Sequence, residues 1–329
     1  MTAVIEAAGL AIDYVTNRGT VRALDGADVT LEAGRSLGLV GESGSGKTTL
    51  GMAAGRLLPA NAYHVEGSLL VAGRPIFALN DRDITALRRA LLGFIFQSPM
   101  SALNPTARIG RQMAWALGGR ADVERIHTLL RQVGLTDVKR VTRAFPHELS
   151  GGMAQRVVIA MAIARRPRLL IADEPTASLD ASIRGQILNL LQTLRKETGA
   201  ALLLLSHELS VVAQHCDSIG VMYGGRVVEF GSSREVFARP VHPYTRALLR
   251  AAPGKEGQGE RLSPIPGATP VLSGPSLGCS FAPRCPLADD HCRRVRPVGH
   301  DVAGRRVACH HAEAAASCCP DTRAERGAP

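Results

Sequence analysis

The apolar residues near the start of this chain follow a strand-like period. Residues 4–15 and 20–32 alternate apolar and polar positions, which predicts two antiparallel strands joined by a turn at Asn17–Gly19. Another strand is predicted around residues 68–73. These segments indicate an antiparallel sheet in the first part of the chain.

Short runs of wholly apolar residues predict strands of a second kind. SLGLV at 36–40, LLIA at 169–172 and LLLLS at 202–206 have the length and composition of buried strands in a parallel sheet. IGVMY-GG-RVVEF at 219–230 predicts a hairpin with a two-residue Gly-Gly turn. Residues 85–165 have periodic apolar positions and are predicted to be mostly helical. The fold class is therefore α/β.

The character of the chain changes near residue 253. Residues 1–252 have the pattern of one large domain without an internal repeat. Gly, Pro and Ser dominate 253–278, which predicts a linker or ordered loop, and 279–311 are predicted to form a small module rich in Cys, His and Arg. The end, 312–329, is predicted to be disordered.

Composition and charge exclude some classes of protein. The 329 residues are 45% apolar and only 4% aromatic, so the core depends on aliphatic side chains. No apolar run is long enough to span a bilayer, and the first residues do not resemble a signal peptide, which predicts a cytoplasmic location. The net charge of +10 is spread along the chain, and this favours a solvated surface over a nucleic-acid track.

A phosphate-binding loop is predicted at GESGSGKT, residues 41–48. It follows the strand at 36–40, and a helix is predicted from Thr48 to Leu58, ending before Pro59. Glycines let backbone N–H groups converge on phosphates, a lysine adds a positive charge, and a hydroxyl can bind Mg²⁺. The candidate ATP contacts here are Gly41, Ser43, Gly44, Ser45, Gly46, Lys47, Thr48 and Thr49.

Polar side chains stand at the ends of three apolar strands. Asp173 and Glu174 follow LLIA, Gln97 ends FIFQ, and His207 follows LLLLS. The carboxyl ends of strands are where open α/β sheets present their chemistry. Residues in these positions can also be purely structural, as strand-capping amides or solvated loop carboxylates.

A second phosphate-binding element is predicted at LSGGMAQ, residues 149–155. Ser150, Gly151 and Gly152 precede a long helical stretch, so their N–H groups lie at a helix N-terminus. One chain therefore has two elements able to bind phosphate.

These motifs, in this order, resemble those of ABC-type ATPases. QSPMSALNPTARIGRQM after Gln97, HPYTRALLRAAP at 242–253 and the cysteine-bearing tail at 279–310 are similar to the ATP-binding subunits of oligopeptide/dipeptide/nickel importers. The resemblance implies a P-loop NTPase core with an antiparallel β subdomain, a helical signature subdomain at about 85–165 and a small Cys-rich C-terminal extension at 253–311. The cassette itself then spans 1–252.

The resemblance also implies roles for individual residues. Glu174 is the general base, His207 contacts the γ-phosphate, and Gln97 contacts Mg²⁺ and the attacking water; with Lys47 they form the catalytic set. Tyr14 has the spacing of the aromatic residue that stacks on adenine. The implied Mg²⁺ ligands are Thr48, Gln97 and Asp173.

In ABC proteins the signature of one subunit contacts the ATP of another. The resemblance implies that this chain pairs with a second ATPase subunit, with a paralogue favoured over an identical copy. LSGGMAQ departs from the commonest LSGGQ by having Met153 and Ala154 before Gln155, a change the peptide-importer group tolerates. The residues expected at the partner's ATP are Ser150, Gly151, Gly152, Gln155 and Asp180.

Four of the seven cysteines cluster in the tail, at Cys279, Cys285, Cys292 and Cys309. A cytosolic protein rarely uses disulfides, so a thiolate metal site is plausible. Four thiolates suit either a 4Fe–4S cluster or Zn²⁺. Some importer subunits bind an iron–sulfur cluster, and the resemblance favours it over zinc; reduced, unliganded cysteines are the third alternative.

The function implied is ATP hydrolysis that powers import of peptides or a related solute. The implied partners are two transmembrane permeases and an extracytoplasmic solute-binding protein, with this subunit peripheral at the cytoplasmic face of a prokaryotic inner membrane. The alternative is a soluble ABC ATPase that acts on nucleic acid or ribosomes. The single cassette and the SALNPT and HPYTRALLRAAP segments argue against it, so no nucleic-acid partner is expected.

Overall fold

Two β-sheets organise the chain, whose computed structural model describes residues 2–119, 122–177, 179–251 and 265–317. The smaller sheet has four antiparallel strands in the order β2-β1-β4-β5. The larger has eight strands in the order β11-β12-β10-β9-β3-β8-β7-β6. The two sheets confirm the predicted combination of an antiparallel subdomain with an α/β core.

The antiparallel sheet is close to its prediction. Its strands are β1 (Ala3–Thr16), β2 (Gly19–Glu32), β4 (Ala62–Val71) and β5 (Arg74–Pro75). The turn between β1 and β2 falls where it was expected. β4 begins earlier than predicted, because its exposed first half pairs with β1 through the backbone and shows no apolar pattern.

The apolar runs form the centre of the larger sheet. β3, β8, β7 and β6 are parallel, β9 lies parallel to β3, and β10 returns antiparallel to β9. The carboxyl ends of the parallel strands therefore meet at one edge. The bounds are Ser36–Val40 (β3), Leu92–Ile95 (β6), Leu169–Asp173 (β7), Ala201–Ser206 (β8), Ser218–Tyr223 (β9) and Arg226–Ser232 (β10).

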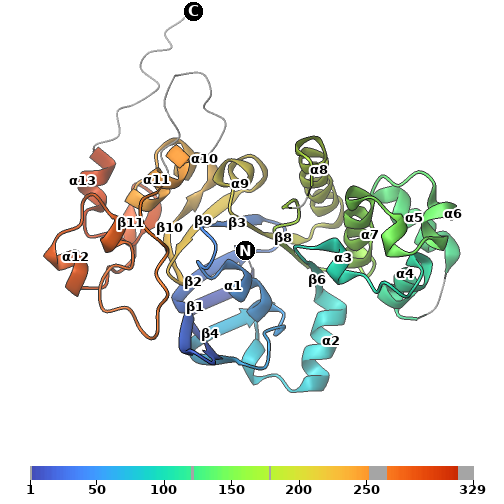
Figure 1. Cartoon of the computed structure of the whole chain (residues 1–329), viewed down its shortest axis with the longest axis horizontal. Coiled ribbons are helices and arrows are strands. Elements are labelled where there is room, and N and C mark those ends of the chain that lie inside the picture. Colours follow the sequence, from blue (N-terminus) through green and yellow to red (C-terminus); the bar gives the residue numbers. More distant parts are fainter. Residues whose placement is uncertain (1, 120–121, 178, 252–264, 318–329) are drawn as a thin grey trace, which may run out of the picture.

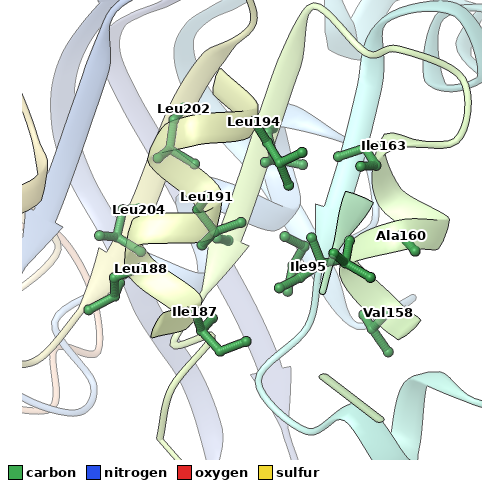
Figure 2. Close-up of a cluster of buried hydrophobic side chains, with 14 of the residues drawn as sticks. Ile95, Val158, Ala160, Ile163, Ile187, Leu188, Leu191, Leu194, Leu202 and Leu204 are labelled. Carbon is green, nitrogen blue, oxygen red and sulfur yellow. The ribbon is translucent and has the colours of Figure 1, made fainter. Parts of the chain in front are cut away.

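Both faces of this sheet are covered, which explains the unbroken apolar runs. Leu202 and Leu204 belong to the core on one side, and Figure 2 shows them beside Leu188 and Leu191 of α8 (Ala181–Thr198). The alternate residue Leu203 belongs to the other core, shared with the antiparallel sheet. α1 (Lys47–Ala54), α2 (Asp81–Leu91) and the single turn η1 (Ile76–Ala78) lie on this second side.

The helix after the phosphate loop is shorter than predicted. α1 ends at Ala54 rather than Leu58, because Gly55 terminates it and Arg56 takes a left-handed conformation with φ of 49°. The apolar residues Leu57 and Leu58 lie in the loop that follows.

A group of helices forms the predicted helical subdomain, although the strand β6 also falls within 85–165. In Figure 1 this group lies at one end of the molecule, opposite the C-terminal extension. Its elements are α3 (Pro99–Ala102), α4 (Ile109–Leu117), α5 (Val123–Gln132), α6 (Val138–Arg143), η2 (Pro146–Glu148) and α7 (Gly151–Ile163).

The C-terminal extension continues the main sheet instead of forming a separate module. β12 (Arg305–Val307) pairs antiparallel with β10, and β11 (His300–Val302) pairs with β12. Residues 265–278 have no helix or strand, and 312–317, expected to be disordered, form α13. The remaining elements are α9 (Leu209–His215), α10 (Ser233–Ala238), α11 (Pro243–Ala251), η3 (Ala282–Arg284), α12 (Asp290–Arg294) and α13 (Ala312–Ser317).

Part of two sequence predictions lies outside the described residues: the first half of the expected linker, through residue 264, and the tail from residue 318. No helix within the described stretches combines the length and apolar character that crossing a bilayer requires.

Candidate nucleotide site

The phosphate loop connects β3 to α1, and two of its glycines are required by close contacts. Gly46, the N-cap of α1, has φ of 101°, and a Cβ there would lie 2.6 Å from the carbonyl oxygen of Ala23. A Cβ on Gly41 would lie 2.2 Å from the carbonyl oxygen of Met222. The loop can therefore follow this path only without side chains at these positions. Its N–H groups and the N-terminus of α1 can bind an anion.

Lys47 lies beneath this loop and is 5% exposed. Its Nζ donates hydrogen bonds to the carbonyl oxygens of Gly41 at 2.7 Å and Glu42 at 3.0 Å. Burial lowers the pKa of Lys47, and the negative charges of Glu174 and Asp173 oppose that shift. The ammonium group is thus held against the loop with two carboxylates nearby.

Thr48 and Asp173 form the pair expected to bind the metal. The Thr48 hydroxyl donates to Asp173 Oδ1 at 3.1 Å, across the gap between α1 and the end of β7. Burial raises the pKa of Asp173, and the hydrogen bond from Thr48 partly offsets the shift. A hydroxyl, a buried carboxylate and the nearby amide of Gln97 are oxygen donors suited to Mg²⁺, so the residues fit the ion.

Glu174 and His207 are brought together from the ends of adjacent strands β7 and β8. Glu174 Oε2 lies 3.1 Å from His207 Nδ1, and the Glu174 N–H donates to the carbonyl oxygen of Leu205 at 2.9 Å. The backbone of Glu174 has φ of 42°, a conformation that is unfavourable for residues other than glycine. Such strain commonly occurs where a side chain must be aimed for function.

A cavity of about 440 Å³ lies over the phosphate loop. Gln97 and Glu174 line it, together with β2 and a segment of the extension. Tyr14 is not among the lining residues; its hydroxyl lies 3.3 Å from Thr49 Oγ1, so adenine stacking by Tyr14 stays a prediction. The full lining is Val21, Arg22, Ala23, Ser43, Gly44, Ser45, Gly46, Lys47, Thr48, Thr49, Gln97, Glu174, Thr269, Pro270, Val271 and Leu272.

The signature residues form the N-terminus of α7, as predicted. Ser150 is the N-cap, and its Oγ accepts a hydrogen bond from the Met153 N–H at 3.3 Å. None of the residues 149–155 lines the cavity over the phosphate loop, so the two anion-binding elements are separate within one protomer. Ser150 and Gly151 are exposed, whereas Gln155 is only 1% exposed; the predicted contact of Gln155 with a partner's ATP stays untested.

Asp180 lies at the N-cap position of α8, where its exposed side chain forms no capping hydrogen bond. This leaves the carboxylate free of local helix contacts. Its predicted place at the interface with a second subunit also stays a prediction.

Sequence reasoning missed several residues that hold the phosphate loop. The Glu42 carboxylate accepts two hydrogen bonds from Arg284 of the extension, at 2.6 and 3.0 Å, and one from Thr269 at 3.2 Å. The Glu42 N–H donates to the Tyr244 hydroxyl at 2.9 Å. The HPYTRALLRAAP segment contains Tyr244, but no local sequence pattern shows that Tyr244, Thr269 and Arg284 contact Glu42.

The four tail cysteines, Cys279, Cys285, Cys292 and Cys309, are free thiols, and three of them act electrostatically on Cys309. Cys292 and Cys309 are buried. Burial raises the pKa of Cys309 to about 11, with smaller contributions from Cys279, Cys285 and Cys292. Within the described residues, three donors close enough for one metal ion occur only at Asp289, Cys292 and His311. The four thiols therefore do not have the tight spacing of a single-zinc site.

The fold and the site together define a nucleotide-binding cassette of the P-loop class. Residues 24–177 match the family model described as ABC transporter. Residues 228–292 match the one described as oligopeptide/dipeptide transporter, C-terminal region. The chain belongs to the ABC transporter ATPases, in the group of oligopeptide/dipeptide transport ATP-binding proteins.

Curated relatives match along nearly the whole chain. A probable peptide ABC transporter ATP-binding protein, y4tR of Sinorhizobium fredii, is 43% identical over 90% of this chain and 91% of its own. The oligopeptide transport ATP-binding protein OppD of Salmonella typhimurium is 41% identical, covering 93% and 92%. The dipeptide transport ATP-binding protein DppD of Bacillus subtilis is 39% identical, covering 90% and 91%.

Solved structures agree with the fold of the cassette. The dimeric structure of MJ0796, a bacterial ABC transporter cassette, is 26% identical, with a TM-score of 0.62 over 70% of this chain and 99% of the other. The same cassette also aligns in a post-hydrolysis state bound to ADP and Pi. cbiO1 from Clostridium perfringens is 28% identical with a TM-score of 0.62, covering 72% and 92%.

Proposed function

We propose that this chain hydrolyses ATP between two cassettes and thereby powers import of peptides through membrane permeases. The observation that carries the proposal is the Glu174–His207 pair, since Glu174 lines the cavity over Lys47 and the phosphate loop. Phosphoryl transfer to water needs mainly positioning and charge neutralisation, and this arrangement offers both.

Each residue has a defined task in this scheme. Lys47 and the loop N–H groups bind the β- and γ-phosphates. Thr48, Asp173 and Gln97 would hold Mg²⁺, which neutralises phosphate charge. Glu174 accepts a proton from the attacking water, while His207 fixes the Glu174 carboxylate and contacts the γ-phosphate. The 3.1 Å bond between Glu174 and His207 supports this coupling.

The proposal places a second ATPase subunit against this one. The exposed helix N-terminus at Ser150 and Gly151 can bind an anion, but these residues do not line the cavity over the phosphate loop of their own protomer. Facing the partner's ATP would supply that anion. The partner is proposed to be a paralogue, as in the sequence prediction, which leaves two composite sites per assembly.

A groove beside the loop after Gln97 supports docking of a permease. It has a volume of about 360 Å³ and lies between β6, α4 and α7. Phe96 and Trp115 line it and are 37% and 47% exposed, large values for aromatic side chains. Exposed aromatic residues in a groove are typical of protein interfaces, and a short permease helix fits such a surface.

Peptides are the proposed cargo because relatives that align along more than 90% of their length bear that description, and the C-terminal region also matches that of peptide transporters. The importer would also include an extracytoplasmic solute-binding protein, with this subunit at the cytoplasmic face of the membrane. The alternative of a nucleic-acid or ribosome ATPase is not favoured, since the matched C-terminal region is that of peptide transporters.

The test of the catalytic proposal is Glu174→Gln. Removing the base should lower turnover by roughly 10²–10⁴-fold while ATP binding is kept. Glu197→Gln, an exposed carboxylate on α8, is the matched control and should leave turnover unchanged. ATPase rates and nucleotide titration measure the two effects. Unchanged turnover in Glu174→Gln would remove Glu174 from the role.

We also propose that the four tail cysteines hold a 4Fe–4S cluster. Each thiolate of such a cluster binds a different iron, so the ligands can be spaced more widely than around one zinc ion. The electrostatic influence of Cys279, Cys285 and Cys292 on the Cys309 thiol supports a common site. Anaerobic purification with iron and zinc analysis tests it; about four irons per chain are expected, and a metal-free, folded protein would refute it.

A further inference from the structure

The extension reaches the nucleotide cavity at two points that the ABC cassette alone does not supply. Thr269, Pro270, Val271 and Leu272 line the cavity over the phosphate loop. Arg284 pairs with Glu42 inside the loop itself. Both contacts join segments more than two hundred residues apart, so they depend on the folded extension.

The segment 269–272 lies beside β2 and lines the cavity together with it. Phosphates occupy the end formed by the loop and the N-terminus of α1, so the base of a bound nucleotide must lie toward the other end. That end is formed by Val21–Ala23 and by 269–272. Val271 is 79% exposed there, an apolar side chain available to pack on a base.

Hydrogen bonds to β2 hold the segment 269–272 in place. The Arg22 N–H donates to the carbonyl oxygen of Leu272 at 2.7 Å. Asp25, also on β2, is 1% exposed and accepts hydrogen bonds from Ser276 and Arg296 of the extension. The segment is thus anchored to β2, and the two line the same end of the cavity.

The ion pair between Arg284 and Glu42 joins the extension to the phosphate loop. The Arg284 side chain is 5% exposed, and it also donates to the Tyr223 hydroxyl at 3.2 Å and to the carbonyl oxygen of Pro266 at 2.7 Å. The hydrogen bond from Arg284 lowers the pKa of Glu42, so the carboxylate is charged and neutralised. Without Arg284, an unpaired carboxylate would stand in the phosphate-binding loop beside an incoming triphosphate.

We propose that the C-terminal extension is a working part of the nucleotide site. Val271 and its neighbours form the wall against the base, and Arg284 is a positioning residue that acts through Glu42 on the phosphate loop. The affinity of this subunit for ATP then depends on the folded state of the cysteine-bearing module. This inference rests on the proposed seating of ATP over the phosphate loop.

The first experiment measures ATP affinity and steady-state turnover of the full-length chain carrying Arg284→Met. We expect KM and Kd for ATP to rise about tenfold with kcat nearly unchanged, the size expected for loss of a charge-assisted bond. Arg306→Met is the matched control. Arg306 also joins the extension to β2, through Asp28 at 3.0 Å, but it does not line the cavity, so ATP affinity should be unchanged.

A double variant separates positioning from simple stabilisation of the fold. In Glu42→Gln/Arg284→Met the uncompensated carboxylate is gone, so ATP affinity should recover to within about threefold of the parent. If the double variant binds ATP as weakly as Arg284→Met, or if Arg284→Met lowers only the melting temperature, Arg284 does not act through Glu42. Circular dichroism and thermal unfolding of each variant establish that the extension is still folded.

The base wall is tested with two probes, ATP and inorganic tripolyphosphate, which has no base. Val271→Ser should weaken ATP binding about threefold and leave tripolyphosphate binding unchanged. Equal effects on both probes, or none on ATP, would overturn the proposed wall. Lys47→Ala should abolish binding of both; if it does not, the proposed seating of ATP fails, which is a different result from failure of the wall.

Discussion

The buried side chain of His242 should make the folded protein less stable in mild acid. Its side chain is 1% exposed, and burial lowers its pKa from 6.5 to about 3. The folded ring is neutral because burial disfavours its charged form, and its Nδ1 accepts the Tyr244 N–H at 3.1 Å. In the unfolded chain the same histidine binds a proton near pH 6.5.

The sign and size of the effect follow from that difference. Below pH 6.5 the unfolded chain takes up a proton at His242 that the folded chain excludes, so stability falls as the pH is lowered toward 3. At pH 5 the difference is about 1.5 pKa units, or about 2 kcal/mol of unfolding free energy relative to pH 8. The buried Glu229, whose pKa is raised by burial, contributes in the opposite direction over part of this range.

The variant His242→Asn isolates the histidine, since an amide oxygen can accept the same N–H but does not titrate. Urea unfolding followed by circular dichroism, at intervals from pH 8 to pH 5, should show the parent losing about 2 kcal/mol more than the variant. Glu229 acts equally in both proteins and cancels. Parallel curves would mean that the folded protein protonates His242, and the assignment of a buried neutral ring would be wrong.

Three further outcomes follow from the structure. Gly38→Ala should lower stability by about 1–3 kcal/mol, because the new Cβ would lie 1.8 Å from Val212 Cγ1, and Val212→Ala should restore much of the loss in a melting experiment. Ser150→Arg should keep ATP binding but abolish hydrolysis and ATP-dependent dimerisation, measured by turnover and gel filtration; normal turnover would exclude the signature from the composite site. Trp115→Asp should retain ATP hydrolysis by the isolated subunit while abolishing co-purification with permeases and peptide uptake; intact uptake would place the docking surface elsewhere.

Local patterns in the sequence predicted most of the fold and the phosphate site. The apolar runs at β3, β7 and β8 are continuous because both sheet faces are covered, and the strand-loop-helix order places Lys47 and Thr48 without reference to distant residues. The end of α1 was missed because the apolar period runs past Gly55, while backbone geometry stops the helix there.

Contacts distant in sequence could not be predicted. Arg284 and Glu42 are 242 residues apart, and either residue alone has the pattern of an ordinary surface charge. The pairing of β12 with β10 was missed for a similar reason, since three residues are too few to show a period. Hence the sequence did not reveal that the extension shares the main sheet.

That shared sheet has a consequence for any attempt to divide the protein. A fragment that stops at residue 252 would leave the backbone groups of β10 open along one side, ready to pair with a neighbouring molecule. It would also strip Arg305 from Glu229, a carboxylate with no exposed surface in the intact chain. Such a fragment should aggregate through edge-to-edge pairing of strands. The C-terminal extension therefore keeps the cassette soluble by covering this sheet edge.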